Sequence, residues 1–235
     1  MHGHALSRVA GFGLAALLLA GATVALAASP TITHSKAAAV ASAINLRHGD
    51  LPTLQQTPNP TTPQDKRQNA QLTACVGETP EDELFADVSS PSFDGPAPRS
   101  LSVSSEVQVA PSTADVARDY AAISRPRALT CVARALVSAL RSSLPKGDTA
   151  AATVRRFTIA VSGVKIVFGL RLAAAVHVKR GNTTVGVPVY IDSIGFANGQ
   201  AEITLNVTSD LAPPSASLES HLADVMAARA RSAIG

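Results

Sequence analysis

The sequence predicts an α+β protein in which an antiparallel sheet packs against helices and one disulfide joins two distant segments. Every even position from Val164 to Val178 is apolar, and this period of two is typical of a strand rather than a helix. Asn198-Gly199 is a strong two-residue hairpin signal. Apolar residues at helical spacing in 126–140 and 215–232 predict the helices that cover the sheet.

The first 28 residues predict an export signal. Arg8 precedes an uncharged run, 9–28, which ends in the small-x-small sequence Ala25-Leu26-Ala27. The secretory peptidase reads such a site, so the mature protein is expected to begin near Ala28. A run of about 20 apolar residues is also long enough to span a bilayer. An uncleaved membrane anchor therefore remains an alternative.

Three further segments follow the predicted signal peptide, 1–28. In the N-terminal helical segment, 29–49, a helix is expected over 35–46, because Ser35 can cap an alanine-rich run. Residues 50–74 form a Pro/Thr/Gln-rich loop, expected to be extended, least structured and most mobile over 50–69. Residues 75–235 form the α+β domain, on which 36–49 is expected to pack.

The first part of this domain contains two expected strands and two expected helices. Strands are predicted over 84–93 and 101–109, and the second shows the clearer apolar/polar alternation. Ser112 is a capping residue for a helix over 113–123. A second helix starts at Pro126.

The second part is expected to be an antiparallel meander. Its four strands are predicted over 153–161, 164–178, 184–196 and 200–208. Ser162-Gly163 is interpreted as a tight turn between the first two strands. Such a meander leaves one face to be covered by helices, and the final helix, 215–232, is expected to supply part of the cover.

Two cysteines, Cys75 and Cys131, are present. An even count in a chain bound for an oxidising compartment predicts a disulfide between them. Two buried free thiols are the alternative, and they would fit a cytoplasmic protein better.

Composition and motifs argue against several functions. The chain has 20 Lys+Arg against 17 Asp+Glu and no Trp, so it lacks the basic stripe and the stacking partners of a nucleic-acid-binding protein. His48 could act with Asp50 as a base and its orienting acid, but no nucleophile motif accompanies them. The histidines beyond the signal also lack metal-ligand spacing: His34, His48, His177 and His221. We expect no catalytic residue, metal or cofactor.

One surface could bind a ligand. The odd face of the long strand carries Arg171, His177 and Lys179. A cationic surface of this kind could meet an anionic ligand, a glycan or a lipid headgroup. The alternative is a solvated sheet face, because alternate polar residues are normal on a half-buried strand.

The order of elements resembles a family of actinobacterial secreted sensor-like domains. The resemblance rests on a helix followed by Asp50-Leu51-Pro52, on Cys75, on a strand running into Ala110-Pro111-Ser112, and on a helix that carries Cys131. The family includes the extracellular domain of PknH-type receptor kinases and related envelope lipoproteins, and the similarity covers roughly 36–208. This chain has two cysteines where the kinase sensor domain has a second disulfide, and it has no kinase domain. The resemblance implies an α+β extracytoplasmic module that binds a ligand in a cleft.

Two functions from different classes follow. The first is a secreted or envelope-associated, non-enzymatic binding module whose ligand is unknown, and the second is a structural or protein-interaction component of the bacterial cell envelope. A hydrolase is a third option. We expect the partner to be an envelope ligand or protein. We expect no nucleic-acid partner, and a membrane is a partner only if the signal is an uncleaved anchor. An apolar cleft between sheet and helices would favour the binding module. A filled core with a large exposed apolar patch would favour the interaction protein.

Overall fold

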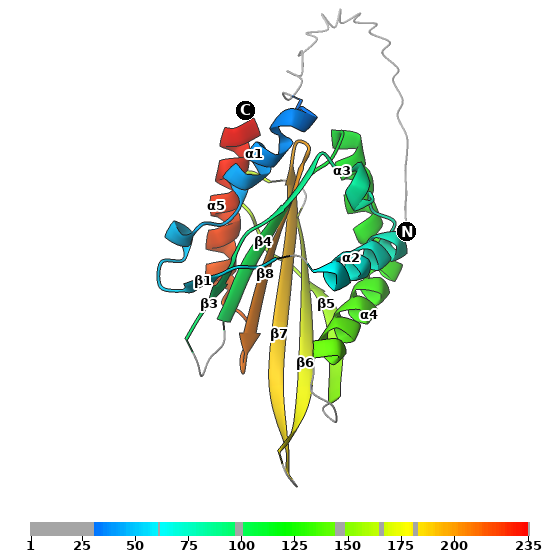
Figure 1. Cartoon of the computed structure of the whole chain (residues 1–235), viewed down its shortest axis with the longest axis vertical. Helices are drawn as coiled ribbons and strands as arrows, with labels where there is room; N and C mark the ends of the chain where they lie inside the picture. The colour runs from blue at the N-terminus through cyan, green and yellow to red at the C-terminus, as the bar shows by residue number, and fades with distance from the viewer. Residues whose placement is uncertain are drawn as a thin grey trace, which may run out of the picture.

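The computed structural model describes residues 31–60, 62–96, 101–143, 149–164, 167–180 and 183–234. The predicted export signal lies outside these residues. Within them the predicted fold class is confirmed, because an eight-stranded antiparallel sheet packs against helices (Figure 1). No helix in the described ranges is both long enough and apolar enough to cross a membrane.

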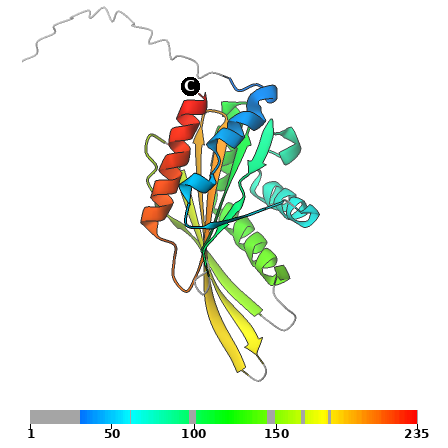
Figure 2. The same cartoon turned by 60° about the vertical axis from the view of Figure 1, so that its left-hand side comes forward.

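The sheet has the strand order β1-β3-β4-β8-β7-β6-β5, and β2 pairs with β4 beside β3. Its strands are β1 (Gln55–Thr57), β2 (Ala86–Ser89), β3 (Ser92–Asp94), β4 (Leu101–Val109), β5 (Thr149–Phe157), β6 (Val167–Arg180), β7 (Thr183–Asn198) and β8 (Ala201–Asp210). Strands β5 to β8 form the predicted antiparallel meander, and β8 closes it against β4. The far ends of β6 and β7 extend beyond the helices (Figure 2).

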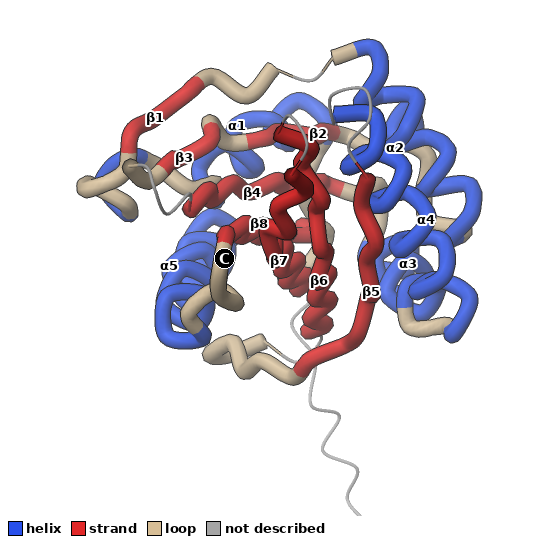
Figure 3. Tube along the Cα trace, turned by 90° about the horizontal axis from the view of Figure 1, so that it is seen from below, coloured by secondary structure: helices blue, strands red, loops and turns tan. Residues whose placement is uncertain are grey.

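Helices cover both faces of the sheet, whereas the sequence predicted cover on one (Figures 1 and 3). One face carries α1 (His34–Ile44) and α5 (Ala216–Ile234). The other carries α2 (Pro63–Val76), α3 (Thr113–Ile123) and α4 (Pro126–Ser143). The polar sides of β4 and β8 face this second layer of helices.

The main hydrophobic core lies between the sheet and the pair α1 and α5. Alternate residues of β8 point into it, and all are fully buried: Ala201, Ile203, Leu205 and Val207. Leu222 and Met226 of α5 and Ile44 of α1 meet them from the helical side. Burying a side chain the size of leucine contributes about 1.5–3 kcal/mol, so this face holds much of the stability of the fold.

The predicted loop over 50–74 is wrong from residue 63 onward, where α2 begins. Thr62 caps the helix, its hydroxyl accepting a hydrogen bond from the backbone N–H of Asp65. The Asp65 carboxylate accepts one in return from the Thr62 backbone N–H. Pro63 occupies the first helical position, where its missing N–H has no cost. The same proline that suggested a helix breaker therefore starts a helix.

The predicted strand over 84–93 divides into β2 and β3 at Ser90-Pro91. Pro91 has no N–H, so it cannot extend a ladder of hydrogen bonds. The Ser90 hydroxyl instead accepts a hydrogen bond from the backbone N–H of Ser105, at 2.8 Å. Both segments consequently pair with β4, one after the other.

The predicted turn at Ser162-Gly163 is present, with Gly163 at a positive φ and the Val164 N–H donating to the Val161 carbonyl oxygen, but it lies in a longer connection between the paired strands β5 and β6. Strand β5 already ends at Phe157, opposite Gly169 of β6. The following segment crosses to α5, where the Ser162 N–H donates to Asp224 and Arg231 donates to the Ser162 carbonyl oxygen. The turn therefore contacts the last helix instead of closing a tight hairpin.

The predicted disulfide between Cys75 and Cys131 is confirmed, with a Cα–Cα distance of 5.9 Å. It joins the last turn of α2 to α4. The two cysteines are 56 residues apart in the sequence. Closing a loop of this length stabilises the folded state by on the order of 4 kcal/mol in the chain-entropy estimate. Since Val76 is the only described residue of α2 that is fully buried, the disulfide is a principal attachment of this helix.

Candidate functional site

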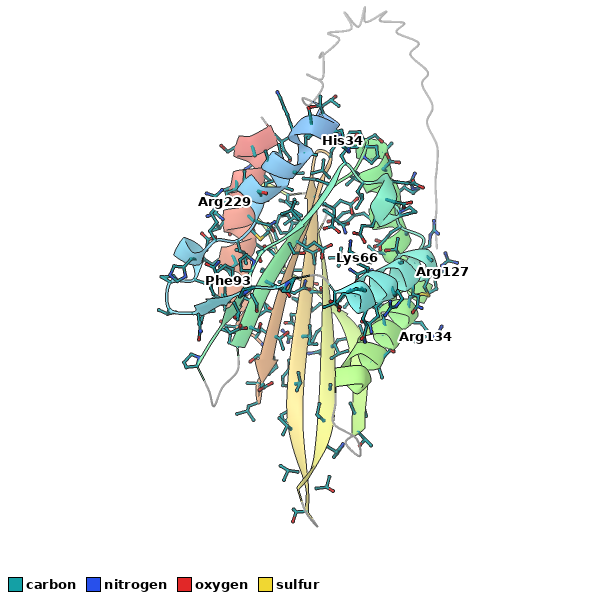
Figure 4. All side chains as sticks on the ribbon, in the orientation of Figure 1. His34, Lys66, Phe93, Arg127, Arg134 and Arg229 are labelled. Carbon is teal, nitrogen blue, oxygen red and sulfur yellow. A yellow bond between two sulfur atoms is a disulfide. The ribbon has the colours of Figure 1, made fainter. Side chains whose placement is uncertain are left out.

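A cavity of about 850 Å³ lies between the sheet and the layer formed by α2, α3 and α4. Its floor consists of residues from β4, β6, β7 and β8, and its roof comes from α2, the segment after it, and α3. Figure 4 labels Lys66, from the first turn of α2, on this side of the sheet, and Arg229 of α5 on the other. Its lining includes four acidic and two aromatic side chains that define its character: Glu78, Glu106, Asp119, Glu202, Tyr120 and Phe168.

The floor follows from the alternation of two strands. In β8, Glu202, Thr204 and Asn206 point into the cavity while their neighbours point into the core. In β4, Glu106 and Gln108 do the same. Successive side chains of a strand lie on opposite faces, so one strand supplies both the dry core and the polar floor.

The apolar part of the cavity is built around two aromatic rings. Tyr120 of α3 and Phe168 of β6 lie with their ring centroids 5.6 Å apart. The Phe168 ring crosses over Gly195 of β7, where an added Cβ would meet it at 2.1 Å. Gly195 is therefore needed for the ring to take this place. Leu170 and Ile191 continue the apolar floor.

One group of carboxyls joins the roof to the floor. Asp119 of α3 accepts hydrogen bonds from the backbone N–H and the hydroxyl of Thr79, at 3.0 and 2.6 Å. Burial raises the pKa of Glu202 to about 8, and the nearby Asp119 and Glu78 carboxyls add to the rise. Burial likewise raises the pKa of Glu78 to about 7, with Asp119 contributing. Glu78 and Glu202 therefore titrate near neutral pH.

A second group lies on the side of the cavity formed by β2 and β4. Burial raises the pKa of Glu106 to about 7, and the neighbouring Asp87 carboxyl raises it further. The Gln108 side chain donates a hydrogen bond to Glu106 at 2.7 Å. Asp87 itself remains exposed to solvent. This group therefore connects the polar floor with the outside.

Positive charge at the cavity is sparse among the described residues. Lys66 lies 3.9 Å from Glu81, and both side chains are about half exposed or more. Arg118 contacts Asp115 at 2.8 Å and Asp119 at 3.7 Å. A surface pair such as Lys66–Glu81 is worth little. Within the described ranges, Glu78, Glu106 and Glu202 make no ion pair.

The residues predicted for a cationic surface lie away from this cavity. Arg171 is on β6, but its guanidinium forms an ion pair and two hydrogen bonds with Asp192, which is fully buried on the α5 side of the sheet. His177 is exposed near the end of β6. The side chain of Lys179 lies outside the described residues. A ligand-binding role for these three residues stays a prediction.

The other residues considered from the sequence, Asp50 and His48, have structural roles. Asp50 accepts two hydrogen bonds from Arg229 of α5, at 2.8 and 2.6 Å, and one from the Arg47 backbone N–H. It fastens the segment after α1 to the last helix. His48 begins a short 3-10 turn that ends at Asp50. In the described part of the chain, no group of three or more His, Cys, Asp or Glu side chains could hold a metal ion.

Comparisons with known proteins give one distant similarity. No family model matches the chain, and no curated protein matches it. Among solved structures, the extracellular domain of PknH from Mycobacterium tuberculosis matches over 87% of this chain and 99% of that chain, with 10% sequence identity and a TM-score of 0.44. These values describe a distant structural resemblance, and they transfer no site residue to this chain.

Sequence reasoning missed this site, although part of its signal was visible. The apolar/polar alternation of β4 predicts a polar face on this strand, but it does not predict the helices that cover that face. The roof depends on α2, whose Thr62-Pro63-Gln64-Asp65 start is a capping box. Recognising that start would have placed a helix beside the acidic segment 78–83.

Proposed function

We propose that this chain is an extracytoplasmic, non-enzymatic ligand-binding module whose ligand occupies the cavity between the sheet and helices α2 to α4. The observation that carries the proposal is the cavity itself. Its volume of about 850 Å³ is in the range of small-molecule sites. Its lining combines aromatic and aliphatic side chains with a few convergent polar groups, which is the usual composition of such sites.

The exposed surface supports a binding module over an envelope interaction protein. Among the described residues, the large apolar side chains that are exposed are Val185 and Leu211, at 46% and 57%. Two such side chains are too few for an apolar patch of several hundred Å². Apolar side chains outside the main core line the cavity instead, among them Tyr120, Phe168 and Ile191.

The disulfide supports an extracytoplasmic location. Structural disulfides form in oxidising compartments and are rare in the cytosol. The basic start, apolar run and Ala-x-Ala sequence of residues 1–28 point to the same compartment.

The character of the lining supports a non-enzymatic role. The described residues around the cavity include neither histidine nor cysteine. The Thr79 hydroxyl, which lies at the deep carboxyls, donates its hydrogen bond to Asp119. Such an arrangement suits binding of a polar group more than activation of a nucleophile.

The proposal can be tested with Nile red, a neutral apolar dye. Fluorescence titration is expected to show saturable binding to the purified protein with its disulfide intact. Thr204→Phe places a ring in the cavity floor and should abolish binding, whereas Thr184→Phe, at an exposed position of β7, should leave it unchanged. Equal dye binding by all three proteins would contradict the site. Turnover of an ester or glycan substrate by the wild type would contradict the non-enzymatic role.

A further inference from the structure

The cavity has a strong excess of acidic side chains. Seven carboxyl side chains line it, against one basic side chain, Lys66: Glu78, Glu81, Asp82, Asp87, Glu106, Asp119 and Glu202. Lys66 already lies beside Glu81 at the solvent-exposed edge. An anionic ligand would enter against this charge with no free cation to receive it in the described lining.

The deep end of the cavity contains an acceptor that lacks a donor. The Oε1 atom of Glu202 is buried and has no hydrogen-bond partner. Buried polar atoms are almost always paired, so an unpaired one beside a cavity marks a position where a ligand donor would be stabilised. The hydrogen bond between Glu202 and Asp119, which adds to the effect of burial on the Glu202 pKa, leaves this Oε1 atom unpaired.

The apolar part lies next to this acceptor. Tyr120 and Phe168 line the same cavity as Glu202, and the charge of Glu202 contributes to raising the Tyr120 pKa. An ammonium group has three donors and no acceptor, which matches a set of carboxyl oxygens. Aromatic faces also attract cations and accept apolar chains.

We propose that the cavity selects an organic cation: an ammonium group held by Glu202 and its neighbouring carboxyls, with an apolar body against Phe168 and Tyr120. This inference rests on the proposed function, because it names the class of ligand for the same cavity. A neutral ligand of the same shape would leave the carboxyls uncompensated. An anionic ligand would be repelled by them.

The carboxyls also make binding dependent on pH. The pKa values of Glu78 and Glu106 are about 7 and that of Glu202 is about 8, because burial disfavours their charged forms. A bound cation favours the charged forms, so binding should release protons near neutral pH and should strengthen between about pH 6 and about pH 9. The charged and titratable groups that face this set are Lys66, Glu81, Asp82, Asp87, Arg118, Asp119 and Tyr120.

Three probes with one apolar body separate charge from shape. Phenylbutylamine, phenylbutanol and phenylbutyrate are titrated into the wild type by calorimetry. We expect the amine to bind about tenfold tighter than the alcohol and the carboxylate to bind weakest, as expected for hydrogen bonds to charged groups. Repeating the amine titration in buffers of different ionisation enthalpy should show proton release.

Two glutamates with similar properties provide the matched variants. Glu202→Gln should remove the preference for the amine and leave phenylbutanol binding unchanged. Glu219→Gln is the control: this glutamate also has a buried, unpaired Oε1 atom and a pKa raised to about 8, but it lies on the α5 side of the sheet. Glu106→Gln is a second cavity variant if Glu202→Gln fails to fold.

The outcomes separate the inference from the proposed function. If the alcohol or the carboxylate binds as tightly as the amine, or if Nile red binds and no amine does, the cationic ligand class is overturned while the cavity remains a site. If none of the probes and no Nile red binds, the proposed function fails with it. An equal loss of amine binding in Glu202→Gln and Glu219→Gln would also overturn the assignment to this cavity.

Discussion

The two faces of the sheet are built from the same strands but have opposite characters. On the α1 and α5 side, Ile203 and Leu205 of β8 are fully buried in a closed core. On the other side, Glu202 and Thr204 line a cavity. The difference lies in the helices: α5 packs directly on the sheet, whereas α2 is attached at its end by a disulfide and covers an unfilled space. Amphipathic strands therefore build a core or a binding site according to the helix placed over them.

Glu219 and Glu202 show the same contrast on the scale of one side chain. Both have a pKa raised to about 8, with burial as the main cause. Glu219 lies in the packed layer beside the ion pair of Arg171 and Asp192. Glu202 lies beside open space. Only the second can exchange its proton for a ligand without unpacking the protein.

Substitutions at two neighbouring residues of β8 should show the largest difference in their effect on the free energy of unfolding. Leu205→Ala removes a fully buried side chain from the core and should lower the free energy of unfolding by about 2–5 kcal/mol. Thr204→Ala, on the cavity side, should lower it by less than about 1 kcal/mol, because no packed side chain is lost. Urea denaturation measures both values. Equal losses would contradict the contrast between the two faces.

The disulfide should matter mainly on the cavity side. Replacing Cys75 and Cys131 together by serine should cost about 2–4 kcal/mol. Amide hydrogen exchange should increase in α2 and much less in α5, because α5 has its own buried face. Uniform protection loss over both helices would mean that the two layers unfold as one unit.

Substitutions at two glycines of β7 test whether Phe168 forms part of the cavity floor. Gly195→Ala forces the Phe168 ring away and should cost about 1–3 kcal/mol, with weaker Nile red binding. Gly186→Ala is the control, because the nearest atom to its added Cβ is 3.8 Å away, on the exposed His177. Binding by Gly195→Ala at the wild-type level would show that Phe168 is not part of the site.

Glu219 should give the stability a dependence on pH. Its folded pKa of about 8 is above the ordinary value of 4.5, so the folded state binds the proton more tightly than the unfolded state does. This contribution is complete below about pH 4.5 and is lost as the pH rises through about 8. Glu219→Gln should flatten the decline, and Glu83→Gln, at an exposed position, should not. Parallel pH profiles for wild type and Glu219→Gln would contradict this reasoning.

Local patterns predicted most of the fold. The helix at Thr113–Ile123, the strand at Leu101–Val109 and the order of the meander follow from alternation, capping and turn residues. The disulfide follows from compartment and cysteine count. These signals are contained in short stretches of chain, so they do not depend on which distant segments pack against them.

The cavity could not be predicted in the same way because it depends on contacts between distant segments. Glu106 and Glu202 are brought together by the pairing of β4 with β8. Arg171 was assigned to an outward cationic face, but it meets a buried aspartate, Asp192, from the next strand. Neither partner is visible in the local pattern, and for the same reason the turn at Ser162-Gly163 contacts α5 instead of closing a tight hairpin.

The most direct measurement is a titration of the isotopically labelled protein with phenylbutylamine, followed by backbone and methyl NMR. The account predicts saturable shifts for residues around the cavity, including Tyr120, Leu170 and Thr204, and unchanged signals for Leu222 and Met226 on the α5 side. Shifts centred on His177 at the end of β6, with an unchanged cavity, would contradict it and would restore the cationic strand face as the binding surface.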